Sequence, residues 1–229
     1  MDIATNLQRI RDRIAAACAR CGRDPAGVRL VAVSKTHPLS AIQAARAAGQ
    51  TLFGENYVQE FLAKADCMAP PVEWHFLGHL QSNKVKTLAG RVTLIHSLDR
   101  LSLAEEIDRQ WGRLGQRAEV LVEVNLGGEA SKAGVAETEL EPLLRRLASL
   151  PHLAVRGLML LPPYCDDPEA VRPYFRRLRE LAGEIDRLRL PEVELRELSM
   201  GMSHDFPVAI EEGATLIRVG TAIFGERHG

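Results

Sequence analysis

The stretch LVAVSKTHPLSAIQAARAAG, residues 30–49, contains one complete strand, turn and helix. Its first part, LVAVS (30–34), is a short apolar run rich in valine, which predicts a buried strand of a parallel sheet. Pro38 predicts the start of a helix and Gly49 its end, because proline is favoured in the first turn of a helix and glycine just after the last one. Apolar residues three and four apart lie between them, so this helix would pack on the strand.

The same unit recurs along the rest of the chain. Seven further apolar runs, each followed by a turn and a stretch with helical spacing, predict strands: TLF (51–53), VEWHF (72–76), VTLIH (92–96), AEVLVEV (118–124), AVRGLML (154–160), VELREL (193–198) and TLIRV (215–219). Eight strands that are each followed by a helix match a (β/α)8 TIM barrel in number, order and length. The alternative is an open doubly wound sheet, which usually has fewer strands.

The segment before the first unit predicts an extra N-terminal helix. Its apolar residues share one helical face as far as Gly22; they are Ile3, Leu7, Ile10, Ile14, Ala17 and Cys21. Cys18 and Cys21 have no second cysteine pair nearby, which favours core packing over a zinc site. No linker-like stretch interrupts the units that follow, so residues 1–229 are expected to form a single domain.

The composition is that of an ordinary globular protein and argues against several classes. The chain has 29 basic and 30 acidic side chains and a formal net charge of -1, so it lacks the positive charge expected of a nucleic-acid or anionic-membrane binder. It shows no run of 18 apolar residues, no secretory leader pattern and only four scattered cysteines. We therefore expect a cytoplasmic protein that binds neither nucleic acid nor membrane.

Two loops predict an anion site. In TIM barrels, ligands bind at the carboxyl ends of the strands, and phosphate is frequently held by the loops after strands seven and eight. Here these loops are LSMGMS (198–203) and GTAIFG (220–225), which offer small residues, hydroxyls and backbone N–H groups. The alternative for each loop alone is structural: Ser203 would cap a helix and Gly220 would turn the chain. Their occurrence at both strand ends favours the anion.

Lys35 ends the first strand, at the mouth of the predicted barrel. Partial desolvation there would lower the pKa of its amine and leave it able to form a Schiff base with an aldehyde. The alternative is a strand-end lysine whose amine reaches water. A phosphate-binding loop across the same mouth favours the first interpretation, since a phosphorylated aldehyde cofactor needs both groups.

Arg218 interrupts the apolar strand TLIRV just before the second of these loops. A charge in that position must be paired or must face a ligand. The pairing alternative is a carboxylate such as Glu197 or Glu55. If Arg218 faced a pyridine nitrogen instead, its permanent charge would keep that nitrogen unprotonated and make the ring a poorer electron sink.

Six segments resemble one known family, the pyridoxal phosphate homeostasis proteins, which are single-domain relatives of the alanine racemase barrel. They are LVAVSKTHP, FGENYVQE, WHFLGHLQSNK, HSLDR, LRELSMGMSHDF and IRVGTAIFGER, and the resemblance runs from about residue 5 to 227. It implies a fold-type III barrel with pyridoxal 5′-phosphate (PLP) held as a Schiff base on Lys35. It also implies that Arg218 faces the pyridine nitrogen, that Asn56 lies near the ring, and that Ser199, Gly201, Gly220 and Thr221 hold the phosphate.

The resemblance further implies a carrier or regulator of PLP in vitamin B6 homeostasis, with no established enzymatic reaction and no catalytic residue. Apo forms of PLP-dependent enzymes would be its protein partners. One departure is His37, where some members carry a second lysine, so any PLP transfer that depends on that lysine would be weaker. Lys132 resembles a family lysine that would provide a secondary PLP site; the alternative is a solvated loop lysine.

Two enzyme classes remain as alternatives. A PLP-dependent amino-acid racemase would need a second domain that contributes a catalytic tyrosine, whereas this chain ends at Gly229, directly after the predicted barrel. The usual racemase dimer contact would be missing as well, so we expect a monomer. Metal-assisted hydrolysis would need ligands such as His75 and His79, but His75 ends a strand and Gly78 lies between them, so the helical geometry of paired ligands is absent. We expect no metal site. A protein with no small ligand would leave the lysine, the arginine and both loops unexplained.

Overall fold

The computed structural model describes residues 2–68, 72–128 and 133–226. Within them, eight parallel strands form a closed barrel: β1 (Arg29–Val33), β2 (Leu52–Glu55), β3 (Glu73–Phe76), β4 (Leu94–Leu98), β5 (Ala118–Asn125), β7 (Leu153–Leu160), β8 (Val193–Ser199) and β9 (Leu216–Val219). Each strand pairs with the next, and β9 pairs with β1 to close the ring. The predicted TIM barrel is therefore confirmed, and the open sheet is wrong. A two-residue strand that was not predicted, β6 (Val135–Ala136), pairs with the end of β5.

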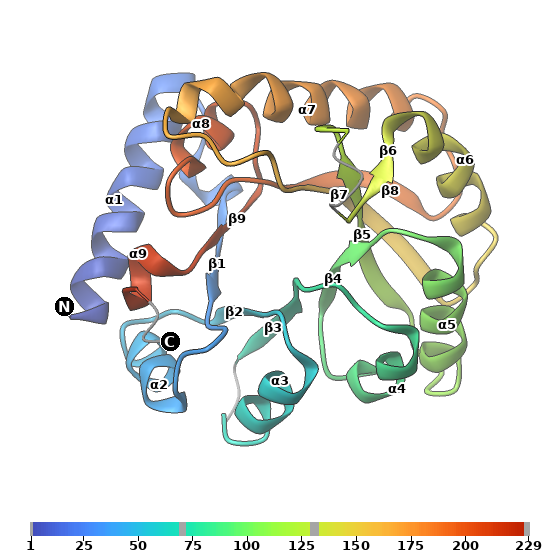
Figure 1. Ribbon diagram of the computed structural model, residues 1–229, viewed down its shortest axis with the longest axis horizontal. Coiled ribbons are helices and arrows are strands. Elements are labelled where there is room, and N and C mark those ends of the chain that lie inside the picture. Colours follow the sequence, from blue (N-terminus) through green and yellow to red (C-terminus); the bar gives the residue numbers. More distant parts are fainter. Residues whose placement is uncertain (1, 69–71, 129–132, 227–229) are drawn as a thin grey trace.

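Helices form the outer layer around the strands (Figure 1). They are α1 (Ile3–Cys21), α2 (Leu39–Ala47), α3 (Val58–Ala65), α4 (Val85–Leu88), α5 (Leu101–Gly112), α6 (Glu137–Leu147), α7 (Arg172–Asp186), α8 (Phe206–Glu211) and α9 (Thr221–Phe224), with short 3-10 turns at Pro25–Gly27, Ser82–Lys84 and Pro168–Val171. Within the described ranges, no helix is both long enough and apolar enough to cross a membrane.

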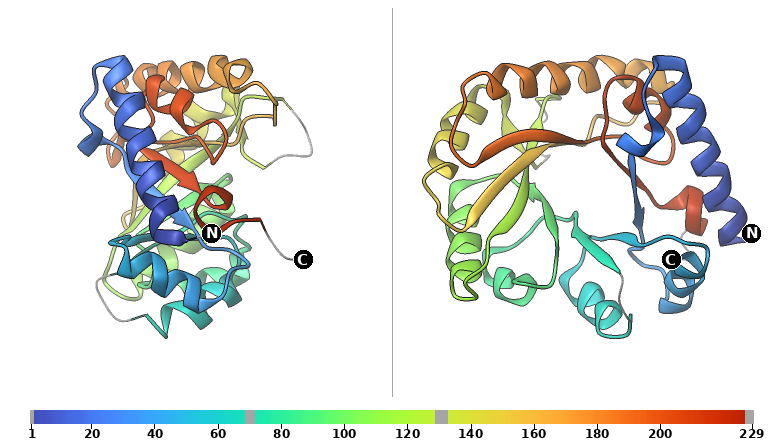
Figure 2. Two further views of the ribbon diagram at one scale, coloured as in Figure 1. Left: turned by 90° about the vertical axis from the view of Figure 1, so that its left-hand side faces the viewer. Right: turned by 180° about the vertical axis from the view of Figure 1, so that it is seen from behind.

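The extra N-terminal helix is confirmed. Asp2 caps its start by accepting hydrogen bonds from the backbone N–H groups of Ala4 and Thr5, and Gly22 ends it with a φ of 69°. The helix packs along α2, α8 and α9 on the outside of the barrel, as Figure 2 shows. Asn6 Nδ2 donates to the carbonyl oxygen of Ile223 at 2.9 Å, which ties this helix to α9, the short helix after the last strand.

The core has two parts. The larger lies between strands and helices, whereas a smaller apolar cluster fills the barrel interior; its members are Val31, Val33, Leu52, Leu77, Leu94, Leu121, Met159 and Leu216. Because successive strand residues point to opposite faces, this cluster identifies the inward positions of each strand. Four buried polar residues lie two positions from a member of this cluster, so polar groups lie inside the barrel as well: His75, His96, Glu123 and Arg218.

Candidate functional site

A cavity of about 580 Å³ lies at the carboxyl ends of the barrel strands. Sites for small molecules typically enclose roughly 300–1,000 Å³. Five of the seven predicted site residues line this cavity, namely Lys35, Asn56, Arg218, Gly220 and Thr221. The other two, Ser199 and Gly201, lie behind its wall. We refer to this space as the mouth cavity.

Lys35 follows Ser34, the residue after β1, and is half-buried at the edge of the mouth cavity. The next residue, Thr36, has a φ of 65°, a left-handed conformation that is rare for a β-branched residue and implies local strain. Its backbone N–H donates to Glu60 Oε2 at 2.8 Å, which holds the strained peptide in place. The backbone on both sides of Lys35 is thus fixed by groups from α3 and β2.

A buried ion-pair cluster supports this segment. Lys64 Nζ donates to Glu55 Oε1 and to the carbonyl oxygen of Ser34, both at 2.7 Å, and to Glu60 Oε2 at 3.0 Å. The Ser34 hydroxyl donates to the same Glu55 oxygen at 2.6 Å. Burial raises the pKa of Glu55, and its bonds with Lys64 and Ser34 oppose that rise. We name Ser34, Glu55, Glu60 and Lys64 the Lys64 cluster. Their bonds hold the residues on either side of Lys35 in place. Sequence reasoning missed the cluster; only the four-residue spacing of Glu60 and Lys64 could have signalled part of it.

Asn56 follows β2 and carries an unsatisfied group. Its Oδ1 atom is buried and has no hydrogen-bond partner among the described residues. Such an orphan acceptor costs about 1–3 kcal/mol unless a partner is supplied. Because Asn56 also lines the mouth cavity, a ligand that donates a hydrogen bond fits here. The peptide of Asn56 is held tightly, since a Cβ on Gly78 would lie 2.1 Å from its carbonyl oxygen.

The two predicted anion loops meet at Ser203. Its hydroxyl oxygen accepts hydrogen bonds from the backbone N–H groups of Gly220 and Ala222, both at 3.3 Å. The alternative that Ser203 caps the next helix is wrong, because Asp205 is the N-cap residue of α8. Both bonds are long, and the two N–H groups converge on one point at the cavity wall. This arrangement suits a phosphate oxygen, with the Thr221 side chain alongside.

Gly201 supports the loop from behind the wall. Its φ is 91°, and a Cβ there would lie 2.6 Å from Ala209 Cβ, so only glycine fits without rearrangement. Its carbonyl oxygen accepts from the backbone N–H of Arg218 at 3.0 Å. Direct contact of Gly201 or Ser199 with phosphate stays a prediction.

Arg218 is only 5% exposed, and among the described residues its side chain donates to a hydroxyl and a carbonyl and to no carboxylate. Nη1 donates to Ser199 Oγ at 2.5 Å, and Nη2 donates to the carbonyl oxygen of Leu160 at 2.9 Å. The predicted alternative of an ion pair with Glu197 or Glu55 is wrong: Glu197 accepts from Thr215, and Glu55 belongs to the Lys64 cluster. Burial lowers the pKa of Arg218 to about 10, against the attraction of Asp205 and Glu123. Since a guanidinium has five N–H donors, some remain for an acceptor in the mouth cavity.

Behind Arg218, a run of hydrogen bonds crosses the barrel interior. Ser199 Oγ lies 2.9 Å from His96 Nδ1, His96 Nε2 lies 2.9 Å from His75 Nδ1, and His75 Nε2 lies 3.0 Å from Glu73 Oε1. Arg29 donates to Glu73 at the far end, at 2.7 Å. We name these groups, from Arg218 to Arg29, the histidine chain. It was not predicted.

The histidine chain also bears on the metal alternative. His75 is buried in it, whereas His79 is 56% exposed on its side chain and lies 3.5 Å from Asp99, so the two histidines do not face one another. Among the residues that the structure describes, no group of three or more His, Cys, Asp or Glu side chains could hold a metal ion. His37 packs its ring on Phe224, with centroids 5.0 Å apart, and Lys132 lies outside the described residues.

Glu123 is a further inward residue, 5% exposed, that sequence reasoning did not single out. Burial raises its pKa to about 7, with Asp99 adding to the rise and Arg218 opposing it. The folded state therefore holds this proton up to about pH 7, whereas the unfolded chain loses it near pH 4.5. The contribution of Glu123 to stability is full below that lower pH and is lost as the pH rises through 7.

Glu123→Gln is consequently expected to raise the free energy of unfolding by about 2 kcal/mol at pH 8 and by little at pH 5. Urea denaturation at both pH values measures this difference. Glu105→Gln, a change at an exposed position on α5, should give equal stability at each pH relative to the native chain. A Glu123→Gln effect on stability that is the same at pH 5 and pH 8 would contradict the raised pKa of Glu123.

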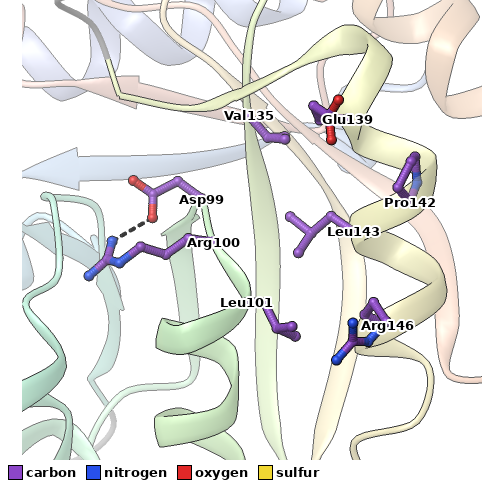
Figure 3. A pocket seen from close by; sticks show the side chains of 8 residues that line it. All are labelled: Asp99, Arg100, Leu101, Val135, Glu139, Pro142, Leu143 and Arg146. Atoms are coloured by element: carbon purple, nitrogen blue, oxygen red, sulfur yellow. Dashed lines mark hydrogen bonds and ion pairs between the residues drawn. The ribbon is translucent and has the colours of Figure 1, made fainter.

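A second pocket, of about 310 Å³, lies outside the barrel between the start of α5 and α6 (Figure 3). Leu101, Pro142 and Leu143 form its apolar side. Its Arg100 donates to Asp99 at 2.6 Å and to the carbonyl oxygen of Leu80 at 3.0 Å. None of its residues has a buried polar atom that lacks a partner. The mouth cavity therefore remains the candidate site.

Comparisons with known proteins show the family and the fold of this chain. The family model of the alanine racemase N-terminal domain matches residues 5–228. A "Pyridoxal phosphate homeostasis protein" of Aquifex aeolicus is 50% identical over 228 residues, 99% of each chain. PipY of Synechococcus elongatus PCC7942, solved with PLP bound, is 40% identical with a TM-score of 0.86, over 97% of this chain and 100% of that one. Alanine racemase of Corynebacterium glutamicum, 18% identical with a TM-score of 0.74 over 98% of this chain and 61% of that one, shares the fold. The chain belongs to the pyridoxal phosphate homeostasis protein family, and its barrel has the fold of the alanine racemase N-terminal domain.

Proposed function

We propose that this protein binds PLP as a Schiff base on Lys35 and acts in the cytoplasm as a carrier or regulator of that cofactor. The observation that carries the proposal is the mouth cavity, which is lined by an amine, a buried guanidinium and the Ser203 hydroxyl on which two backbone N–H groups converge. Family membership and the PLP-bound relative support it. We also propose that the protein is a monomer and that apo PLP-dependent enzymes receive the cofactor.

Each lining residue has a role in this proposal. Lys35 supplies the amine that condenses with the aldehyde of PLP, with loss of one water. The phosphate is bound by Gly220, Thr221 and Ala222. It accepts the two backbone hydrogen bonds that the Ser203 hydroxyl accepts without the cofactor. Asn56 Oδ1, which has no partner among the described residues, accepts a hydrogen bond from the bound cofactor. Arg218 donates to the ring nitrogen.

Bound PLP supplies an electron sink, and its strength depends on the group that faces the ring nitrogen. An arginine keeps that nitrogen unprotonated, so the site holds the cofactor but disfavours carbanion chemistry. The racemase-like alternative also needs a second base opposite Lys35. Tyr164 lines the mouth cavity, but it is 79% exposed, and a hydrogen bond with Asp166 raises the pKa of its phenol, which favours the protonated form at neutral pH. A binding role without turnover is the better match.

An absorbance titration with PLP tests the proposal. We expect a band near roughly 420 nm that borohydride bleaches, with the reduced adduct on the peptide containing Lys35. Lys35→Ala should abolish the band, whereas Lys86→Ala, at an exposed position on α4, should retain it. A native protein that stays colourless with PLP, or an adduct on another lysine, would overturn the Schiff base. Steady formation of D-alanine from L-alanine by the PLP-loaded protein would favour the racemase alternative.

A further inference from the structure

The histidine chain is a buried hydrogen-bond network of which the proposed function uses only Arg218. It contains groups from β9, β8, β4, β3 and β1, and so passes from the mouth cavity to the opposite end of the barrel. Ser199 and His96 are fully buried and His75 is 1% exposed, so water does not compete for these bonds. Buried polar networks of this kind are costly unless every member is satisfied. Every ring nitrogen and hydroxyl of the histidine chain has a hydrogen-bond partner, and one end of the histidine chain is Arg218.

With both histidines neutral, the acceptor at the Glu73 end fixes the direction of every bond in the histidine chain. An arginine only donates, so Ser199 Oγ accepts from Arg218, and the Ser199 hydroxyl donates its own hydrogen to His96 Nδ1. His96 then carries its proton on Nε2 and donates it to His75 Nδ1. His75 in turn donates from Nε2 to Glu73, an ionised carboxylate that only accepts. Burial favours the neutral form of both rings, and in that form both are Nε2–H tautomers.

The charges around the chain agree with this assignment. The bond from His75, followed by the bond from Arg29, lowers the pKa of Glu73 to about 2, so the accepting end is ionised. Burial lowers the pKa of His96 and of His75. His96 faces His75 from β3 and Arg218 from β9, whereas His75 faces Glu73 on its own strand, Arg29 from β1 and Glu197 from β8. A proton on His96 would thus add a second positive charge beside Arg218.

We propose that His96 and His75 are positioning residues for Arg218: they orient the Ser199 hydroxyl so that its oxygen accepts from the guanidinium and holds it toward the mouth cavity. This inference rests on the proposed function, because it concerns how firmly PLP is held there. Without the acceptor on His96, the Ser199 proton loses its partner, and Asp205 and Glu123 are the carboxylates whose attraction acts on Arg218. The guanidinium would turn toward them and away from the ring nitrogen.

Variants of His96 test the proposal through PLP affinity and spectrum. His96→Leu removes both ring nitrogens and is expected to raise the Kd for PLP about tenfold to a hundredfold, the usual effect of losing a hydrogen bond to a charged group, and to shift the absorbance band. His96→Asn keeps an acceptor for Ser199 and should bind PLP within about threefold of the native protein. His79→Leu, outside the chain, should change neither. Because burial lowers the pKa of both His96 and His75, the ratio of the PLP affinities of the native protein and His96→Asn should stay constant between pH 7.5 and 5.5.

A folded His96→Leu protein with native affinity and spectrum would overturn the proposal. Nitrogen-15 NMR of the histidines in the PLP-free native protein keeps it testable if that variant does not fold. Two buried Nε2–H tautomers at pH 7 are expected, and a doubly protonated or Nδ1–H ring in the chain would overturn it. Failure of the native protein to bind PLP would count against the proposed function alone, since the NMR measurement needs no PLP.

Discussion

Lys64→Met is expected to lower the free energy of unfolding by about 3–5 kcal/mol, the usual effect of removing one partner of a buried ion pair. Lys64 Nζ makes three hydrogen bonds, and Glu55, which receives one of them, is fully buried. The second carboxylate oxygen of Glu55 already lacks a partner. Methionine would leave that charge inside the protein with only the Ser34 hydroxyl. Urea denaturation measures the loss, and Lys86→Met at an exposed position on α4 is the control.

The same substitution is expected to weaken PLP binding. Lys64 holds the carbonyl of Ser34 and the carboxylate of Glu60 that fixes Thr36, the residues on either side of Lys35. The double variant Lys64→Met with Glu55→Gln replaces the pair by neutral groups and should recover most of the lost stability. Because Glu60 has no hydrogen bond from Lys64 in the double variant either, PLP affinity should recover less than stability does. A Lys64→Met protein as stable as the native chain, or a double variant less stable than the single one, would contradict this interpretation.

Gly78→Ala is expected to cost about 3 kcal/mol of stability or more and to displace Asn56 from the mouth cavity. The added Cβ would lie 2.1 Å from the carbonyl oxygen of Asn56 and 2.8 Å from its Cα, and these are backbone atoms that cannot turn aside. The loops after β2 and β3 would therefore separate. Since Ser97 donates to the carbonyl oxygen of Gly78 at 2.5 Å, the loop cannot move without losing that bond.

Thermal unfolding and PLP titration measure the two effects of Gly78→Ala. Gly183→Ala provides the matched control, because its Cβ would meet nothing within 4 Å in the interior of α7. That variant should gain about 0.5–1 kcal/mol, the usual preference of a helix for alanine. Equal stability of Gly78→Ala and the native protein would show that the loops after β2 and β3 are less tightly packed than the structure indicates.

The fold was predictable from sequence because each barrel strand is a short apolar run bounded by turn residues. Strand β6 was not predicted because its two residues, Val135 and Ala136, are too few to show a periodic pattern. The position of Lys35 and Arg218 at strand ends was sufficient to place them at the mouth, since all strands of a barrel end there. How far each side chain lies from the cavity surface was not predictable. Ser199 ends β8, but its side chain lies behind Arg218 and not on the cavity wall.

The histidine chain and the Lys64 cluster could not be predicted for a different reason. His75 and His96 lie in strands that read as apolar, and nothing in either segment indicates that the two rings meet. Their contact depends on the register between β3 and β4, in which His75 is aligned with Leu94. Lys64, Glu55 and Ser34 likewise come from three separate elements, and only the packing of α3 on the strands brings them together. Long-range pairs of this kind leave no local pattern.

The pairing of β1 with β9 has a consequence for biosynthesis. Lys35 leaves the ribosome well before Arg218, Gly220 and the Ile223 carbonyl that holds Asn6, because these lie far downstream of it in the sequence. Until then the first strand lacks one neighbour and the barrel stays open along that seam. In our proposal the cofactor can therefore be loaded only after β9 and α9 have been made, and a nascent chain that exposes Lys35 before then cannot bind PLP at the complete site.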